Sequence, residues 1–140
     1  MENSIIPNEV ISDKIYFIRN QKVMLDKDLA GLFDVETKRI NEQVRRNSLK
    51  FPEHFMFQLN ENEYEILKSQ FATSSWGGTR KLPYVFTEHG ILQLSNVLKS
   101  ERATQMSIKI IEIFVSLREF INSNLIVKLE IEEIKKKLTN

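Results

Sequence analysis

The segment from residue 26 to residue 47, DKDLAGLFDVETKRINEQVRRN, has the pattern of a helix-turn-helix, and it constrains the fold more than any other part of the chain. Asp26 is predicted to be the N-cap of a first helix, because an Asp side chain accepts hydrogen bonds from the backbone N–H groups of a first helical turn. Asp34 follows where this helix should end, because Asp tolerates a left-handed backbone better than most residues. Thr37 is then predicted to cap a second helix. The apolar residues of the first helix follow helical spacing and define one buried face: Leu25, Leu29, Leu32 and Phe33.

The second predicted helix buries Ile40 and Val44, which leaves its opposite face to solvent. That face holds residue types that read base edges in the major groove of DNA, where Arg pairs with guanine and Asn with adenine. In helix-turn-helix proteins the N-terminal part of the second helix faces the bases. This nominates three base-contacting residues: Thr37, Lys38 and Asn41. Cations that flank or follow them are expected to hold phosphates: Arg39, Arg45, Arg46 and Lys50.

An ordinary solvated helix with long charged side chains has the same pattern, so the motif alone does not decide between the two readings. Asp34 stands where such turns usually have Gly, and Glu36 and Glu42 place acids near the proposed DNA surface. The net charge of +1 is low for a protein that binds nucleic acid. The charge is uneven, however, because residues 36–50 contain five basic and two acidic side chains.

Composition places the chain among globular proteins, since 41% of its 140 residues are hydrophobic and 28% are charged. Without Cys it can form neither a disulfide nor a thiolate metal site. The two His residues, His54 and His89, have no second His at metal-ligand spacing, and no catalytic motif occurs. We therefore expect no enzyme activity, cofactor or metal. No apolar run is long enough for a membrane span and no signal peptide begins the chain, so a cytoplasmic protein is expected.

Around the helix-turn-helix, the pattern predicts short strands. Residues 15–25 alternate as a hairpin with a polar turn at residues 19–22, and residues 55–59 and 82–86 alternate as two further strands. The last two strands would form a wing beside the helix-turn-helix. The loop between residues 69 and 81 is then a second DNA contact, with Arg80 and Lys81 on phosphates. The alternative is an ordinary surface loop with Trp76 packed on the core.

Helices are predicted between and after these strands. Asn60 is expected to cap a helix that runs to about Ser69, and Thr87 to cap another that runs to Leu98. A long helix then starts near Ser100 and continues to the end of the chain. Its apolar residues recur at alternating spacings of three and four, with one Asn among them: Met106, Ile110, Ile113, Leu117, Phe120, Asn124, Val127, Ile131, Ile134 and Leu138.

This heptad pattern indicates a coiled coil between two copies of the chain. In the first half of the helix, Ile111, Phe114 and Ile121 add a second apolar stripe, so that half is predicted to pack on the domain. A single Asn in a coiled-coil core fixes register and dimer state at some cost in stability. The predicted dimer contacts are Asn124, Val127, Ile131, Ile134 and Leu138. The alternatives are a tail that frays or one that packs on a further domain.

Together these features predict an α+β fold: a helix-turn-helix with a small β hairpin and wing, followed by a long C-terminal helix. Residues 1–121 would form the DNA-binding domain and residues 122–140 a helical, coiled-coil tail.

Several blocks of the sequence resemble the phage-type ORF-six N-terminal domain, a relative of the KilA-N and Bro N-terminal domains of phage antirepressors and large DNA viruses. The blocks are DLAGLFDVETKRINEQVRRNSLKFPEHFMFQL, SQFATSSWGGTRKLPYVFTEHGILQLSNVLKSERA and the helix that follows, so the resemblance covers roughly residues 15–120. It implies a DNA-binding module of phage or prophage origin with a regulatory role, encoded by a phage or associated with a bacterial nucleoid.

The partners expected are double-stranded DNA and a second copy of the chain, without a membrane. The alternative function is an antirepressor-like module that binds a repressor protein and never reads DNA. The resemblance does not assign base-contacting residues, so the site residues above depend on the helix-turn-helix pattern.

Overall fold

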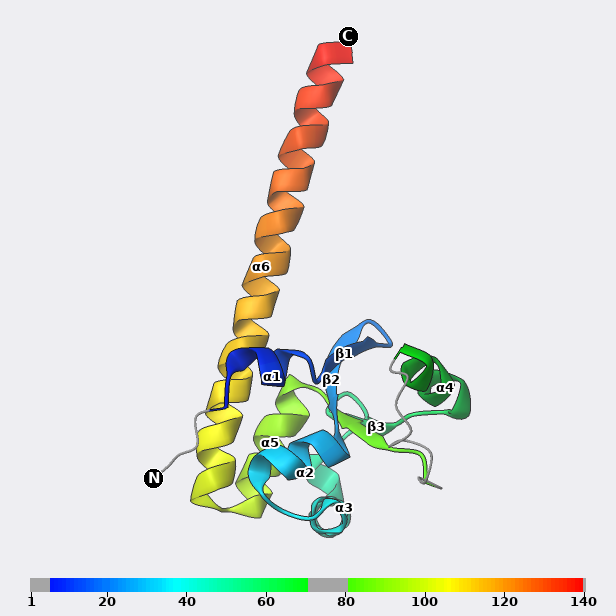
Figure 1. Cartoon of the computed structure of the whole chain (residues 1–140), viewed down its shortest axis with the longest axis vertical. Coiled ribbons are helices and arrows are strands. Elements are labelled where there is room, and N and C mark those ends of the chain that lie inside the picture. Colours follow the sequence, from blue (N-terminus) through cyan, green and yellow to red (C-terminus); the bar gives the residue numbers. More distant parts are fainter. Residues whose placement is uncertain (1–5, 71–80, 140) are drawn as a thin grey trace.

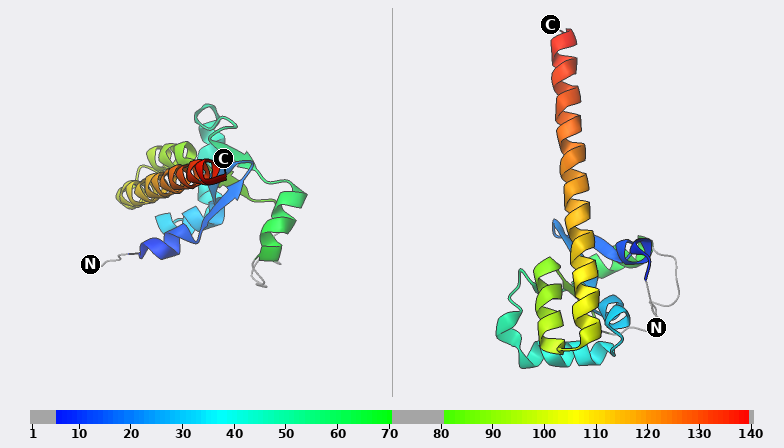
Figure 2. Two further views of the ribbon diagram at one scale, coloured as in Figure 1. Left: turned by 90° about the horizontal axis from the view of Figure 1, so that it is seen from above. Right: turned by 90° about the vertical axis from the view of Figure 1, so that its left-hand side faces the viewer.

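The computed structural model describes residues 6–70 and 81–139 and has the predicted α+β fold (Figure 1). A four-stranded antiparallel sheet lies between helices, and a long helix extends away from the rest of the chain (Figure 2). In chain order the elements are α1 (Asn8–Ser12), β1 (Ile15–Ile18), β2 (Gln21–Leu25), α2 (Asp26–Phe33), α3 (Thr37–Arg46), the 3-10 helix η1 (Ser48–Lys50), β3 (Met56–Gln58), α4 (Glu61–Gln70), β4 (Tyr84–Phe86), α5 (Glu88–Leu98) and α6 (Glu101–Thr139).

The predicted hairpin and wing form one sheet with the strand order β1-β2-β4-β3. Sequence patterns suggested two separate pairs of strands, but β4 pairs with β2 as well as with β3. Met24 lies opposite Phe86, and Leu25 lies opposite Val85. Because β2 leads directly into α2, this pairing places the start of α2 beside β4.

The hairpin turn is tighter than predicted. Only Arg19 and Asn20 form it, with φ angles of 54° and 63°. Two successive residues in the left-handed region match the twist of antiparallel strands, so two-residue hairpins favour this conformation. Gln21 and Lys22 therefore belong to β2 rather than to the turn.

Alternation along the strands creates a core on each face of the sheet. On one face, α4 covers a smaller core: Val23, Leu25, Phe57, Leu59, Tyr64, Leu67 and Val85. On the other face, Met24 and Phe86 join the larger core built by α2, α3, α5 and α6. The helix α1, which the sequence pattern did not predict, adds the fully buried Ile11 to this larger core.

Predicted helix caps at Asn60 and Thr87 are confirmed. The Oδ1 of Asn60 accepts from the backbone N–H of Glu63 at 2.8 Å, and Glu63 Oε1 accepts from the backbone N–H of Asn60 at 2.9 Å. This reciprocal pair is a capping box, which satisfies two donors at once. The Oγ1 of Thr87 accepts from the backbone N–H of Gly90.

The helix α6 changes environment along its length. Met106, Ile110 and Ile113 are buried in the larger core, and Leu117 is packed against it. From residue 118 to residue 138 every side chain is exposed, including Ile121, which was expected to pack on the domain. The burial of α6 therefore ends four residues before the predicted domain boundary, which stays a prediction.

Substitution of Gly90 by Ala should strongly destabilise the fold. A Cβ atom at this position would lie 2.0 Å from the backbone oxygen of Phe55, so β3 or α5 would have to move, at a cost of roughly 1–3 kcal/mol or more. The matched control is Gly31→Ala, because nothing lies within 4 Å of a Cβ there. That helical variant should gain about 0.5–1 kcal/mol. Urea unfolding measures both, and equal effects would contradict the predicted difference.

The ion pair between Arg19 and Glu63 should give the fold a dependence on pH. Arg19 Nε lies 2.8 Å from Glu63 Oε2, and the guanidinium also stacks over the Phe57 ring. The Arg19 side chain lowers the pKa of Glu63 below its usual value. This stabilisation is therefore fully present above the pKa of Glu in the unfolded chain, about 4.3, and is lost as pH falls through the lower pKa of the folded state.

Arg19→Ala should therefore reduce stability at neutral pH, and its difference from the unsubstituted chain should shrink as the solution is acidified. Thermal unfolding of both chains between about pH 7 and pH 3 tests this. A difference that stays constant over that range would show that only the contact with Phe57 matters.

Candidate nucleic-acid interface

The turn between α2 and α3 has the geometry predicted for Asp34. This residue ends α2 in the left-handed conformation, with φ 60° and ψ 46°. The next residue, Val35, donates its backbone N–H to Ala30 O at 3.0 Å and packs against the larger core. Arg102 Nε, on α6, donates to Leu32 O at 3.0 Å. These bonds satisfy the carbonyl groups at the end of α2 and fix where α3 begins.

Both predicted caps of the helix pair are wrong. Asp26 is the first residue of α2, and Leu25 occupies the N-cap position. Thr37 is likewise the first residue of α3, because the carbonyl of Glu36 already accepts from the backbone N–H groups of Arg39 and Ile40. Neither N-cap position makes a side-chain capping bond.

Asp26 instead joins α2 to β4. Its side chain is 5% exposed, with Oδ1 2.7 Å from the backbone nitrogen of Lys27 and Oδ2 3.3 Å from that of Tyr84. Burial raises the pKa of Asp26, and the two backbone hydrogen bonds oppose the shift. A carboxylate predicted as a local cap thus makes a contact across 58 residues of sequence.

The solvent-facing side of α3 carries the predicted cations. Ile40 is fully buried and Val44 partly buried, as expected. Five basic side chains on or next to α3 are exposed: Lys38, Arg39, Arg45, Arg46 and Lys50. Lys38 Nζ lies 4.0 Å from Glu36, and both groups are largely exposed. Within residues 6–70 and 81–139, the other four side chains have no carboxylate at ion-pair distance.

A hollow of about 240 Å³ adjoins this side of α3. Thr37 and Asn41, one turn apart on α3, line it together with Lys81. The structure thus brings two of the three predicted base-contacting residues next to one predicted phosphate-contacting residue. Lys38 does not line the hollow, and Arg80 and Trp76 lie outside the described residues.

Sequence reasoning did not assign the other six residues that line this hollow to the site: Asp26, Lys27, Tyr64, Leu82, Pro83 and Tyr84. They come from α2, α4 and the segment that leads into β4, and the pairing of β4 with both β2 and β3 brings these elements together. At the other end of α3, Gln93 Nε2 donates to Lys50 O at 3.3 Å and holds η1 against α5.

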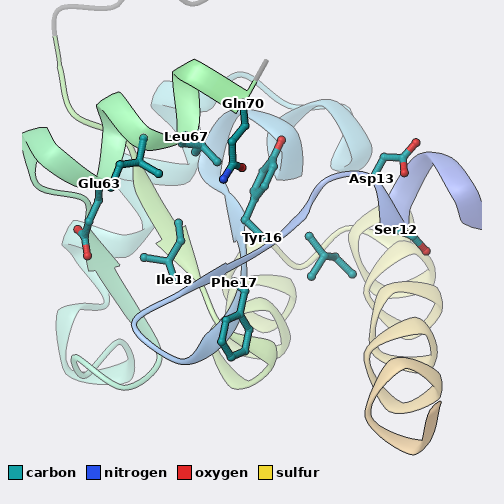
Figure 3. A pocket seen from close by; sticks show the side chains of 10 residues that line it. Ser12, Asp13, Tyr16, Phe17, Ile18, Glu63, Leu67 and Gln70 are labelled. Atoms are coloured by element: carbon teal, nitrogen blue, oxygen red, sulfur yellow. The ribbon is translucent and has the colours of Figure 1, made fainter. Parts of the chain in front are cut away.

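A larger hollow, of about 580 Å³, lies between β1 and α4 (Figure 3). Its charged lining residues are Asp13 and Glu63, and Glu63 is already paired with Arg19. Burial, together with the charges of Asp28 and Asp13, raises the pKa of Tyr16 in this hollow to about 12. Acidic surroundings repel phosphates, so the α3 side is the better candidate for a nucleic-acid interface.

No group of three or more His, Cys, Asp or Glu side chains in residues 6–70 and 81–139 is arranged to hold a metal ion. No helix in the same ranges is long and apolar enough to cross a membrane.

Comparison with known proteins gives one finding. A family model described as the ORF6N domain matches residues 13–97, which is more than half of the chain. The match includes the sheet, α2, α3 and α4, and nearly all of α5. No curated protein and no solved structure matches.

Asp26→Ala should destabilise the fold by about 1–3 kcal/mol, because it leaves the backbone N–H groups of Tyr84 and Lys27 without their acceptors. The control is Asp13→Ala, an exposed carboxylate at the end of α1, for which a change within about 0.5 kcal/mol is expected. Urea unfolding compares the two. Equal stability of the two variants would show that the cost of burying the Asp26 carboxylate cancels its hydrogen bonds.

Proposed function

We propose that this chain, which belongs to the ORF6N domain family, is a phage-type regulatory protein that binds double-stranded DNA through the solvent-facing side of α3. The observation that carries the proposal is the set of cations on that side. Arg39, Arg45 and Arg46 are exposed without carboxylate partners among the described residues. Cations left free in this way can release the counterions of DNA phosphates, which is the main source of affinity for DNA.

The arrangement supports a division of roles on α3. Thr37, Lys38 and Asn41 lie in its N-terminal half, which helix-turn-helix proteins direct to base edges. Asn can pair with adenine through two hydrogen bonds, which gives Asn41 the most specific assigned contact. The residues assigned to phosphates are Arg39, Arg45, Arg46, Lys50 and Lys81, with Arg80 assigned from the sequence alone. The role needs no cofactor, metal or catalytic step, and it places the protein in the cytoplasm with the DNA.

We also propose that the chain forms a homodimer through the exposed part of α6. The residues predicted to make this contact are all exposed: Asn124, Val127, Ile131, Ile134 and Leu138. Large exposed apolar surfaces mark interaction sites.

The same exposed surface supports a second candidate function, an antirepressor-like module that binds a repressor protein without reading DNA. The two functions differ in their response to salt, because only phosphate contacts make DNA affinity fall steeply as salt rises.

The first experiment is selection of bound sequences from a pool of random duplex DNA at low and moderate salt. We expect salt-sensitive retention and an enriched motif. Retention without a motif would overturn base reading and leave non-specific binding, and no retention at low salt would favour the protein-interaction function.

Two variants separate the roles on α3. Asn41→Ala should lose about 1–3 kcal/mol of discrimination at one base pair, whereas Arg45→Ala should weaken binding to all sequences and reduce the salt slope by about 1. The control is Lys137→Ala, which removes an exposed cation far along α6. Binding is measured on the selected motif and on its single-base variants. Equal losses on every sequence for both α3 variants would contradict the division of roles.

A further inference from the structure

The exposed half of α6 carries a continuous apolar seam. We define the tail seam as the heptad positions after Leu117: Phe120, Asn124, Val127, Ile131, Ile134 and Leu138. The apolar members are between 48% exposed, for Ile131, and 80% exposed, for Leu138. An isolated helix with such a seam is marginal in water, because most helical stability in proteins comes from packing an apolar face. The tail seam therefore needs a partner.

We propose that two copies of this chain pair in antiparallel orientation along the tail seam. A second copy fits because it brings the same spacing of apolar residues, which is what knobs-into-holes packing requires.

The position of the domain argues against a parallel pair. Below the tail seam, the same heptad positions, Met106, Ile110 and Ile113, are buried in the chain's own core. The neighbouring side of α6 is also covered, because Lys109 Nζ donates to Ile6 O, just before α1. A parallel partner in register would run its own residues 101–116 along this occupied side.

The partner could not turn away from this side without a break, because α6 is one continuous helix from Glu101 to Thr139 (Figures 1 and 2). An antiparallel partner avoids the conflict, because only its C-terminal end reaches the level of Leu117.

The antiparallel pair places the two domains at opposite ends of the paired tails. The two α3 surfaces would then act on separate stretches of DNA rather than side by side at one end. This orientation rests on the homodimer proposed above. The pairing depends on α6 and not on DNA binding, so it is tested without DNA.

Orientation can be measured by distances between spin labels, since the chain has no Cys of its own. Leu129→Cys and Lys136→Cys place single labels outside the tail seam, near the middle and near the end of the exposed helix. In an antiparallel pair the two labels at position 129 lie at about the same level, whereas those at position 136 are offset along the helix axis by on the order of 20 Å, at a rise of about 1.5 Å per residue. The distance between the labels at position 136 should therefore be clearly the longer of the two. Equal distances at the two positions would show a parallel pair and overturn the proposal.

The choice of face is tested by a matched pair of variants followed by light scattering. Ile131 and Leu129 are similarly exposed, at 48% and 55%, but only Ile131 belongs to the tail seam. Ile131→Lys should raise the dimer dissociation constant by roughly a hundredfold or more, because it buries a charge. Leu129→Lys should leave it nearly unchanged. A monomeric unsubstituted chain, or dissociation by Leu129→Lys alone, would overturn the proposal.

Discussion

The pairing of β4 with two strands is the constraint on which the rest of the fold depends. This strand has only three residues, yet it lies between β2 and β3 and contributes Val85 to one core and Phe86 to the other. Its first residue, Tyr84, donates its backbone N–H to Asp26 at the start of α2. The same strand thus aligns the sheet, separates the two cores and brings the segment at Lys81 beside α3. Without that pairing, the hollow next to α3 would have no second wall.

Several features determined by neighbouring residues could be predicted from the sequence, although the caps predicted at Asp26 and Thr37 were wrong. Features determined by distant residues could not be predicted. The end of α2 at Asp34 and the caps at Asn60 and Thr87 depend on residues a few positions away, and the structure has them as predicted. The sheet order depends on contacts of Met24 and Leu25 with residues more than fifty positions later, which no local pattern encodes. The short α1 gave no signal because five residues cannot establish a helical period.

At the candidate site, too, local spacing predicted some features, and contacts between distant segments determined the others. Helical spacing was enough to place Lys38, Asn41 and Arg45 on one side of α3, since each lies three or four residues from the next. It could not identify the hollow, which needs side chains from α2, α4 and β4. Heptad spacing on α6 has a related limit, because it is continuous from Met106 to Leu138. The second apolar stripe predicted that the first half of α6 packs on the domain, and the structure shows that this cover ends at Leu117, before the exposed Ile121.

The net charge of +1 is low for the proposed binding of DNA, but acidic and basic side chains lie on different surfaces of this molecule. Exposed cations follow α3 and η1, whereas Asp13 and Glu63 line the hollow between β1 and α4. Exposed charges farther apart than about 10 Å are largely screened at moderate salt, so affinity depends on the charges near the phosphates rather than on the total. A nearly neutral chain can therefore present one cationic surface, which is what the proposed binding of DNA at α3 requires.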